Sequence, residues 1–231
     1  MRVFWIMLLE RNLSYEAVTS LCQVAYDCAL RDYTQMFLPY CRTDIARNKA
    51  VNSFMEVSED DDDVLVMLDA DHAHPMDIVA RLAASPEGVT GALAFRRGAP
   101  FDPCFYVRCA DGQLAQPAEF GGLHEGTVVG TGAIAIKRWV FKALEQAGVK
   151  APYFRYVYEA NTLNMPSEDM YFGYACEKAG ISHWCDTDLV TPHLITSQVD
   201  QTSWAQYLAD HDGQAEKVQI PKRKEVEHAP A

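Results

Sequence analysis

The sequence predicts an α/β protein in which helices cover both faces of a mostly parallel central sheet. Apolar, strand-like runs alternate with amphipathic helical segments through residues 1–100, and this alternation is typical of βα units. The run Val64–Leu68 contains no polar residue, as expected for a central parallel strand that is buried on both faces. With 231 residues, 49% of them hydrophobic, the chain is long enough to enclose one large core.

The N-terminal half is predicted to alternate four strands with three helices. The strands are expected at 3–8, 35–40, 64–68 and 89–95. Ser14 is expected to cap the first helix, whose apolar positions recur at helical spacing: Val18, Leu21, Cys22, Ala25 and Ala29. Thr43 or Asp44 is expected to cap the second helix. A third helix is expected from Pro75, which suits a first helical position, to Gly88.

The C-terminal half is predicted to contain short strands, two helices and a last strand. They are expected as strands at 104–108 and 113–120 around a turn at Asp111-Gly112, a glycine-interrupted strand at 127–137, a helix at 139–147, a helix from Ser167 to Ala179 that Gly180 ends, and a strand at 184–190. We expect residues 1–200 to form a single domain and residues 201–231 to add a short helix and a charged tail, a candidate lid.

The formal net charge of −12 disfavours binding to a polyanion, because nucleic-acid-binding proteins usually carry a basic stripe. Nucleic acid is therefore not an expected partner. The acidic run Glu59–Asp63 resembles a cation trap, but consecutive like charges before a strand more often form a solvated loop. We predict a loop there.

Seven cysteines contain no Cys-x-x-Cys pair and no zinc-type spacing, which indicates reduced thiols in a cytosol-like compartment. The apolar run 3–9 is not followed by a small-residue cleavage site and is interpreted as a strand. No stretch reaches the roughly 20 apolar residues of a membrane span. A soluble, cytoplasmic protein is therefore expected.

Two carboxylates, Asp69 and Asp71, directly follow the central strand. Ligands of open α/β sheets collect at the carboxyl ends of the strands. Side chains two positions apart on an extended segment point the same way, so both carboxylates are predicted to face one hard cation, or a diphosphate held through a cation. The alternative is a capped strand-to-helix turn, since Asp also favours turns.

The order of these landmarks resembles that of the GT-A glycosyltransferases, in particular the small soluble family-2-like members of bacteria and phages. The matching segments run from the second helix to residue 193: Ala46-Arg47-Asn48, Leu68-Asp69-Ala70-Asp71-His72, Gly130-Thr131-Gly132, Ser167-Glu168-Asp169 and His193. The resemblance implies a Rossmann-like three-layer sandwich. It also implies metal-dependent hexosyl transfer from a nucleotide-sugar donor, with a UDP-sugar as the family expectation, to a carbohydrate or other hydroxyl acceptor.

The resemblance implies a divalent metal, Mn²⁺ or Mg²⁺, that neutralises the departing diphosphate. Asp71 and His193 would bind this ion, and Asp69 would contact the ribose or a water on the metal. Carboxylate oxygens suit such hard ions. His72 competes with His193 for the imidazole role because it directly follows Asp71. A lone histidine beside a proline, as at position 193, is more often a surface or core residue.

The acids Glu168 and Asp169 open a predicted helix behind Ser167, where they would also complement the helix dipole. The resemblance implies that Asp169 is the general base that takes the proton of the acceptor hydroxyl in an inverting enzyme. In a retaining enzyme it would hydrogen-bond the acceptor instead. Glu168 is the neighbouring candidate catalytic residue.

Further candidate contacts to the nucleotide-sugar are spread along the chain. By resemblance, Arg47 and Asn48 lie near the base or the phosphates, Asp44 is a candidate uracil contact, and the backbone at Gly132 approaches the donor sugar. Arg97, with Arg96 beside it, leaves a central strand and either holds the diphosphate or the acceptor or is a surface charge.

Aromatic side chains at Trp184 and within Tyr153–Tyr158 are candidates for stacking on an acceptor sugar, although such residues more often belong to a core. Two other functions stay open. Nucleotidyl transfer would need a glycine- and lysine-rich loop after the first strand, where residues 10–12 are Glu-Arg-Asn. A degenerate, non-catalytic domain that binds a metal or a nucleotide-sugar would need neither Asp169 nor His193.

Overall fold

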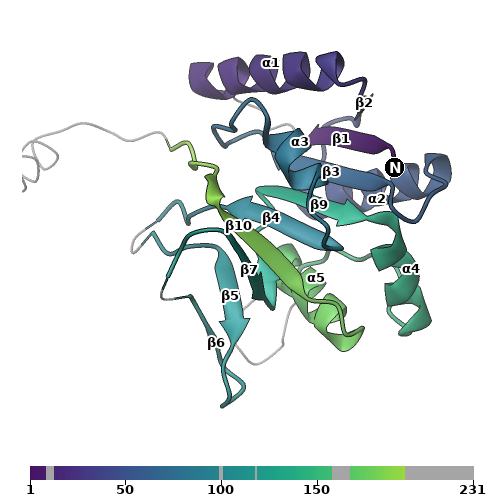
Figure 1. The fold of residues 1–231 in the computed structure, drawn as a ribbon, viewed down its shortest axis with the longest axis vertical. Helices are drawn as coiled ribbons and strands as arrows, with labels where there is room; N and C mark the ends of the chain where they lie inside the picture. Colours follow the sequence, from purple (N-terminus) through teal and green to yellow (C-terminus); the bar gives the residue numbers. More distant parts are fainter. Residues whose placement is uncertain (9–12, 99–100, 118, 158–166, 196–231) are drawn as a thin grey trace, which may run out of the picture. The chain divides into compact units, whose positions relative to one another are not determined.

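The computed structural model describes residues 1–8, 13–98, 101–117, 119–157 and 167–195. Within these residues the chain forms a seven-stranded sheet in the order β2-β1-β3-β9-β4-β10-β7 and a three-stranded sheet in the order β6-β5-β8 (Figure 1). The helix, tail and candidate lid predicted at 201–231 lie outside the described residues, as does Tyr158.

The central sheet is mostly parallel, as predicted. Its strands are β1 (Val3–Leu8), β2 (Thr34–Met36), β3 (Val64–Asp69), β4 (Val89–Leu93), β7 (Leu123–Gly126), β9 (Ala133–Lys137) and β10 (His183–Val190). Only β9 and β7 run against the other five. The smaller sheet contains β5 (Phe105–Arg108), β6 (Leu114–Ala115) and β8 (Val128–Val129).

Helices cover both faces of the central sheet, which confirms the predicted three-layer α/β sandwich. The helices are α1 (Tyr15–Leu30), α2 (Thr43–Val57), α3 (Ile78–Ala83), α4 (Arg138–Gln146) and α5 (Glu168–Lys178). Leu65 and Met67 of β3 pack in the core shared with α2, α4 and α5, whereas Val66 and Leu68 pack in the core shared with α1 and α3. Because successive strand side chains point to opposite faces, burial of both faces explains the wholly apolar sequence of β3.

Helix α1 begins as predicted, with the Ser14 hydroxyl accepting a hydrogen bond from the Ala17 amide at 3.1 Å. Of its five predicted apolar positions, Leu21 and Ala25 pack against the core, whereas Val18 is 43% exposed and Cys22 is exposed. The buried residues of the helix are Ala17, Ser20, Val24, Asp27 and Cys28. Two polar residues lie on the inner face because they have partners there: Ser20 binds the backbone of His74, and Asp27 pairs with Arg31. Polarity therefore does not mark the exposed face of this helix.

Two predicted strands have different extents. β2 ends at Met36 rather than at residue 40, because the chain leaves the sheet edge at Phe37, which is 80% exposed, before Pro39, which has no amide hydrogen to donate. The strand predicted at 127–137 is two strands, β8 and β9, in different sheets. Gly130-Thr131-Gly132 lies between them, where the chain crosses from one sheet to the other. β7 was absent from the prediction.

Two helix starts also differ from the prediction. α3 begins at Ile78 and not at Pro75. Neither Thr43 nor Asp44 caps α2: Arg42 is the N-cap residue, and no side chain makes a capping hydrogen bond. The Asp44 carboxylate instead forms two hydrogen bonds of 2.6 Å with the Arg42 guanidinium.

The acidic run at 59–63 forms a loop, as predicted, but its last residue is structural. Asp63 is fully buried, and its carboxylate accepts hydrogen bonds from the Arg2 amide at 2.6 Å and the Arg2 guanidinium at 2.9 Å. All seven cysteines are free. No helix in the described part of the chain is long and apolar enough to cross a membrane.

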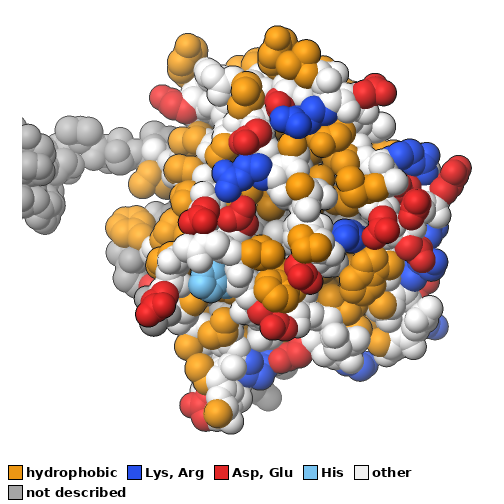
Figure 2. All heavy atoms as spheres, viewed as in Figure 1, with side chains coloured by type: hydrophobic (Ala, Val, Ile, Leu, Met, Phe, Trp, Pro, Cys, Tyr) orange, Lys and Arg blue, Asp and Glu red, His pale blue; other side chains and the backbone are white. Residues whose placement is uncertain are grey.

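The charged side chains on the face shown in Figure 2 are mixed. Lys and Arg are scattered among Asp and Glu there, without a continuous basic stripe. This face is consistent with the negative net charge of the chain.

Candidate functional site

A cleft of about 530 Å³ opens at the carboxyl ends of β1 and β3, where ligands of such sheets are expected. The side chains and backbone that line it come from six parts of the chain: Met7, Leu8, Leu38, Pro39, Tyr40, Cys41, Arg42, Thr43, Ala46, Asp69, Ala70, Asp71, Arg97, Glu168 and His193. The predicted aspartates, Arg97, Glu168 and His193 therefore meet in one place.

Backbone pairing explains how His193 reaches this cleft. The Ala73 amide donates to the Pro192 carbonyl at 2.9 Å, and the Leu194 amide donates to the Asp71 carbonyl at 2.8 Å. This short antiparallel bridge sets His193 beside Asp71, which lies 122 residues earlier in the sequence, with 3.1 Å between His193 Nε2 and Asp71 Oδ2.

Three side chains form a group of metal-donor atoms at this bridge. One ligand atom each from Asp71, His72 and His193 lies within 4.8 Å of the others. His72 Nδ1 is 3.1 Å from the Thr191 carbonyl oxygen, and His193 Nδ1 is 2.9 Å from the Phe95 carbonyl oxygen. A carbonyl oxygen only accepts, so each Nδ1 donates, and in the neutral ring Nε2 carries the lone pair. Anchoring of this kind is typical of imidazoles that bind metals.

The two imidazoles stack on each other, with ring centroids 4.0 Å apart. Burial, with a smaller contribution from His193, lowers the pKa of His72 to about 4. His72 is therefore neutral near pH 7 and able to act as a ligand. His74 is also buried, and burial lowers its pKa to about 4. Its Nε2 lies 2.8 Å from the Asp69 carbonyl oxygen.

Asp69 is bound by a buried arginine and is not part of the donor group. Arg47 Nη2 lies 2.8 Å from both Asp69 carboxylate oxygens, Nη1 donates to the Thr131 carbonyl at 3.1 Å, and Nε lies 3.5 Å from Glu168 Oε1. The side chain of Arg47 is 1% exposed. Burial alone would lower the pKa of Arg47, but the charges of Asp69 and Glu168 outweigh it and raise the pKa. Arg47 therefore stays charged and joins β3, the 130–132 loop and α5.

Glu168 lies in the same ionic cluster and lines the cleft. Burial raises its pKa, while Arg47 and a hydrogen bond from Tyr156 act in the opposite direction. Burial and the Glu168 charge in turn raise the pKa of Tyr156. Arg42 lies over the Tyr156 ring, 5.7 Å from its centroid. Asp44 orients Arg42 through its two hydrogen bonds, and it is Arg42 that lines the cleft.

Asp169 is held at the start of α5. Its Oδ1 accepts hydrogen bonds from the Ser167 hydroxyl and from the Met170 amide, the latter at 2.7 Å. Ser167 occupies the predicted N-cap position, but its side chain binds Asp169 rather than capping the helix amides. Burial raises the pKa of Cys104 to about 11, and the Asp169 charge adds to this rise. Asp169 therefore lies close enough to Cys104, just before β5, to influence it, and it is not among the described residues that line the cleft.

Asn48 uses its amide on the backbone. Its Nδ2 donates to the carbonyls of Asp44 and Phe154 at 2.7 and 2.6 Å, and its Oδ1 accepts from the amides of Tyr153 and Phe154 at 2.7 and 3.2 Å. Tyr153 and Phe154 are buried in the core, so stacking of these two rings on an acceptor sugar is ruled out. Trp184 is half-buried on β10.

Gly132 and Arg97 both adjoin the donor group. A Cβ at Gly132 would lie 2.8 Å from His72 Nε2, and the Gly132 carbonyl accepts the Asp69 amide at 2.8 Å. The glycine is thus required by the close approach of His72. The Arg97 guanidinium contacts the Asp71 carboxylate, and its Nε lies 2.7 Å from His193 Nε2.

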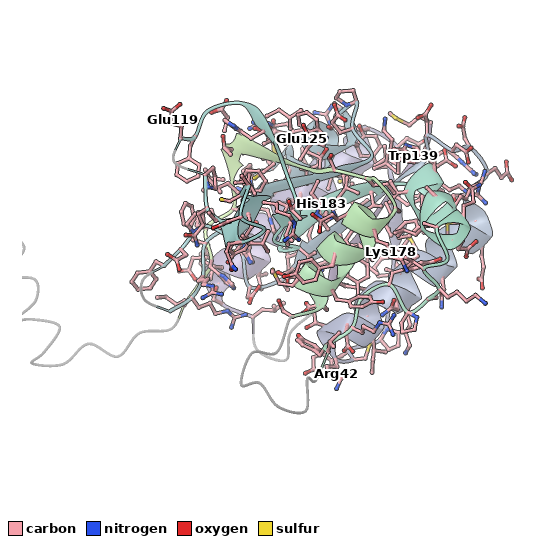
Figure 3. The ribbon with its side chains drawn as sticks, turned by 90° about the horizontal axis from the view of Figure 1, so that it is seen from below. Arg42, Glu119, Glu125, Trp139, Lys178 and His183 are labelled. Atoms are coloured by element: carbon pink, nitrogen blue, oxygen red, sulfur yellow. The ribbon has the colours of Figure 1, made fainter. Side chains whose placement is uncertain are left out.

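The prediction treated His72 only as a competitor of His193, included Tyr156 only within the aromatic cluster 153–158, and did not include Arg42 in the site. Proximity to Asp71 was the available signal for His72, whereas Arg42 carries no local signal. Figure 3 shows Arg42 at the edge of the molecule and His183 between the sheet and α5. His183 is fully buried against Phe172, with ring centroids 5.3 Å apart, and burial lowers its pKa to about 3. It is a core residue.

Comparison with known proteins gives a fold likeness only. No protein-family model matches the chain, and no curated protein matches it in sequence. Among solved structures, A197 from STIV is 17% identical over 97% of this chain and 100% of that chain, with a TM-score of 0.55. The catalytic domain of Drosophila β1,4-galactosyltransferase 7 in complex with xylobiose is 13% identical over 89% and 79%, with a TM-score of 0.43. A glycosyltransferase involved in the glycosylation of the major capsid of PBCV-1 is 10% identical over 86% and 95%, with a TM-score of 0.44.

Proposed function

We propose that this chain is a metal-dependent glycosyltransferase. It would transfer a hexosyl group from a nucleotide-sugar, with a UDP-sugar as the first choice, to a hydroxyl group of a carbohydrate or other acceptor. The observation that carries the proposal is the cleft at the end of β3, where Asp71, His72 and His193 adjoin Glu168 and the Arg47–Asp69 pair. Its volume of about 530 Å³ suits a small-molecule site.

Glycosyl transfer forms a bond from the acceptor oxygen to the anomeric carbon and breaks the bond from that carbon to the diphosphate. Negative charge then develops on the departing phosphate oxygen. Asp71 and His193, together with His72, would hold a divalent ion, which supplies Lewis-acid stabilisation to that charge. Arg97 would pair with the diphosphate, because guanidinium groups bind phosphate oxygens in a bidentate manner.

Asp69 would accept a hydrogen bond from a ribose hydroxyl. Arg47 fixes the orientation of its carboxylate and is itself too buried to reach a ligand. Asp44 and Asn48 would act indirectly, Asp44 by holding Arg42 at the cleft and Asn48 by fixing the backbone at 153–154. The backbone of Gly132 would limit the space beside His72.

Asp169 would take the proton from the acceptor hydroxyl as the new bond forms. The Ser167 hydroxyl, which donates to the same carboxylate, would keep its second oxygen turned towards the acceptor. General-base catalysis of this kind contributes about 10²–10⁴-fold to the rate. A base in this role corresponds to inversion at the anomeric carbon.

Calorimetry of UDP binding with and without Mn²⁺ tests the donor and metal assignments. We expect binding that depends strongly on Mn²⁺ and is abolished by a chelator. UDP binding of unchanged affinity in the absence of metal would remove the central claim. A screen of UDP-, GDP- and TDP-sugars for metal-dependent hydrolysis then identifies the donor, because slow transfer to water needs no knowledge of the acceptor. Binding without hydrolysis of any donor would favour a non-catalytic domain.

A further inference from the structure

Two of the three donor atoms at the cleft are imidazole nitrogens. His72 Nε2 lies 3.7 Å from Asp71 Oδ1, and His193 Nε2 lies 3.1 Å from Asp71 Oδ2. Each ring is oriented by a hydrogen bond from Nδ1 to a backbone carbonyl oxygen, that of Thr191 for His72 and that of Phe95 for His193. The Nε2 atoms of both histidines therefore lie beside the carboxylate of Asp71.

We propose that His72 is the third protein ligand of the metal, in the place expected for Asp69, and that the site selects transition ions over Mg²⁺. This inference rests on the proposed metal-dependent function. Mg²⁺ prefers a shell of oxygen ligands, whereas imidazole nitrogen suits first-row transition ions. Affinity for such a site rises from Mn²⁺ through Co²⁺ towards Cu²⁺. A site with two nitrogens and one carboxylate should therefore favour Co²⁺ over Mn²⁺ and Mn²⁺ over Mg²⁺.

Within the described donor group Asp71 supplies the carboxylate, whereas Asp69 is engaged with Arg47. Both Asp69 oxygens lie 2.8 Å from Arg47 Nη2, so its charge is already compensated by a buried guanidinium. Breaking this pair to coordinate an ion would leave Arg47 buried without its main counter-ion, which is strongly unfavourable. With Asp69 retained by Arg47, the protein offers the ion one carboxylate and two imidazoles, a ligand set poorer in oxygen than Mg²⁺ prefers.

Gly132 is the residue that leaves room for His72. A Cβ there would lie 2.7 Å from His72 Cε1 and 2.8 Å from Nε2. Bonds of about 2.1 Å to a single ion hold donor atoms at most about 4.2 Å apart, so the present group, which spans up to 4.8 Å, has to contract slightly. A methyl group at position 132 would obstruct the imidazole edge that must move.

The test is calorimetric titration of the chelator-treated full chain with Mg²⁺, Mn²⁺ and Co²⁺ alone, without nucleotide. We expect Co²⁺ to bind at least about tenfold more tightly than Mg²⁺. His72→Ala should weaken Co²⁺ binding by more than about tenfold. His72→Asp should reduce the ratio of the Co²⁺ affinity to the Mg²⁺ affinity. Gly132→Ala should also weaken Co²⁺ binding. His124→Ala is the matched control, because His124 lies outside the donor group and its Nε2 is within hydrogen-bond distance of the Gly121 carbonyl oxygen.

A spectroscopic readout on the unaltered chain keeps the test independent of variant folding. With Cu²⁺ as the probe, electron paramagnetic resonance should detect two coordinated imidazole nitrogens. Equal affinities for Mg²⁺ and Co²⁺, a single nitrogen, or unchanged Co²⁺ binding by His72→Ala would overturn the inference and leave metal-dependent transfer standing. Failure of every ion to bind, even with UDP present, would overturn the proposed function as well.

Discussion

Arg47 holds both carboxylate oxygens of Asp69 through a single nitrogen, Nη2, at 2.8 Å. The two aspartates of the same stretch are therefore not equivalent. The charge of Asp69 is compensated inside the protein by a side chain that is 1% exposed. Asp71 faces His193 and Arg97 at the cleft, where an incoming cation would meet it.

Replacement of Arg47 should destabilise the fold before it affects any ligand. Arg47→Ala leaves Asp69 and the buried Glu168 without their shared cation, and loss of one partner of a buried pair costs about 3–5 kcal/mol. Urea denaturation should show an unfolding midpoint lowered in proportion to this loss of unfolding free energy. Lys142→Ala is a suitable control, because Lys142 forms an exposed pair with Asp61 and exposed pairs contribute little. Equal midpoints for the two variants would contradict the structural role of Arg47.

Replacement of Arg97 should change the affinity for metal and the affinity for nucleotide in opposite directions. Its guanidinium contacts the Asp71 and His193 atoms that a cation would use, so Arg97→Ala should raise the affinity for Mn²⁺ alone, by up to about tenfold if a charge-assisted hydrogen bond is removed. The same variant should bind UDP with Mn²⁺ more weakly than the parent chain.

Arg96→Ala provides the matched control for Arg97, since the neighbouring arginine hydrogen-bonds Tyr106 instead. Calorimetry with Mn²⁺, then with UDP and Mn²⁺, measures both effects. If Arg97→Ala lowered both affinities equally, competition between the guanidinium and the metal would be excluded.

Asp169→Asn should slow transfer strongly while keeping the donor bound. The Asn side-chain oxygen can still accept from Ser167 and from the Met170 amide, so the local geometry is retained and only the proton acceptor is lost. We expect turnover to fall by about 10²–10⁴-fold, with calorimetric UDP affinity nearly unchanged. Asp111→Asn, in the exposed turn before Gly112, should turn over normally. Normal turnover by Asp169→Asn would refute the assignment of the base.

Stability should fall in acid through the protonation of Asp63. Burial alone would raise the pKa of Asp63, but hydrogen bonds from the Glu59 amide and from Arg2 outweigh it and lower the pKa to about 2. The unfolded chain has a higher Asp pKa, near 3.9, so the stabilisation is complete above that pH and is lost as the pH falls towards 2. Thermal unfolding between pH 6 and 2.5 should show a smaller pH dependence for Asp63→Asn than for Asp62→Asn. Identical pH dependence of thermal unfolding for the two variants would contradict the role of Asp63.

Local patterns were sufficient to predict the main elements of the fold. A wholly apolar run predicted that β3 is buried on both faces, and a serine ahead of a helical pattern predicted the start of α1 at Ser14. Both predictions depend on forces that act within a few residues. The buried face of α1 could not be predicted in this way, because Ser20 faces inwards to bind His74, 54 residues away.

The sequence by itself determined where the candidate site lies, since ligands of open α/β sheets collect at the carboxyl ends of the strands and the apolar strand β3 ends in carboxylates at the observed cleft. It did not determine which side chains share that site. The alternation that would align Asp69 with Asp71 applies only along β3, which ends at Asp69. Beyond that point the pairing of residues 71–73 with 192–194 sets the direction of each side chain. That pairing depends on the position of β10 in the sheet, so only the tertiary structure could bring His72 and His193 to Asp71 and assign Asp69 to Arg47.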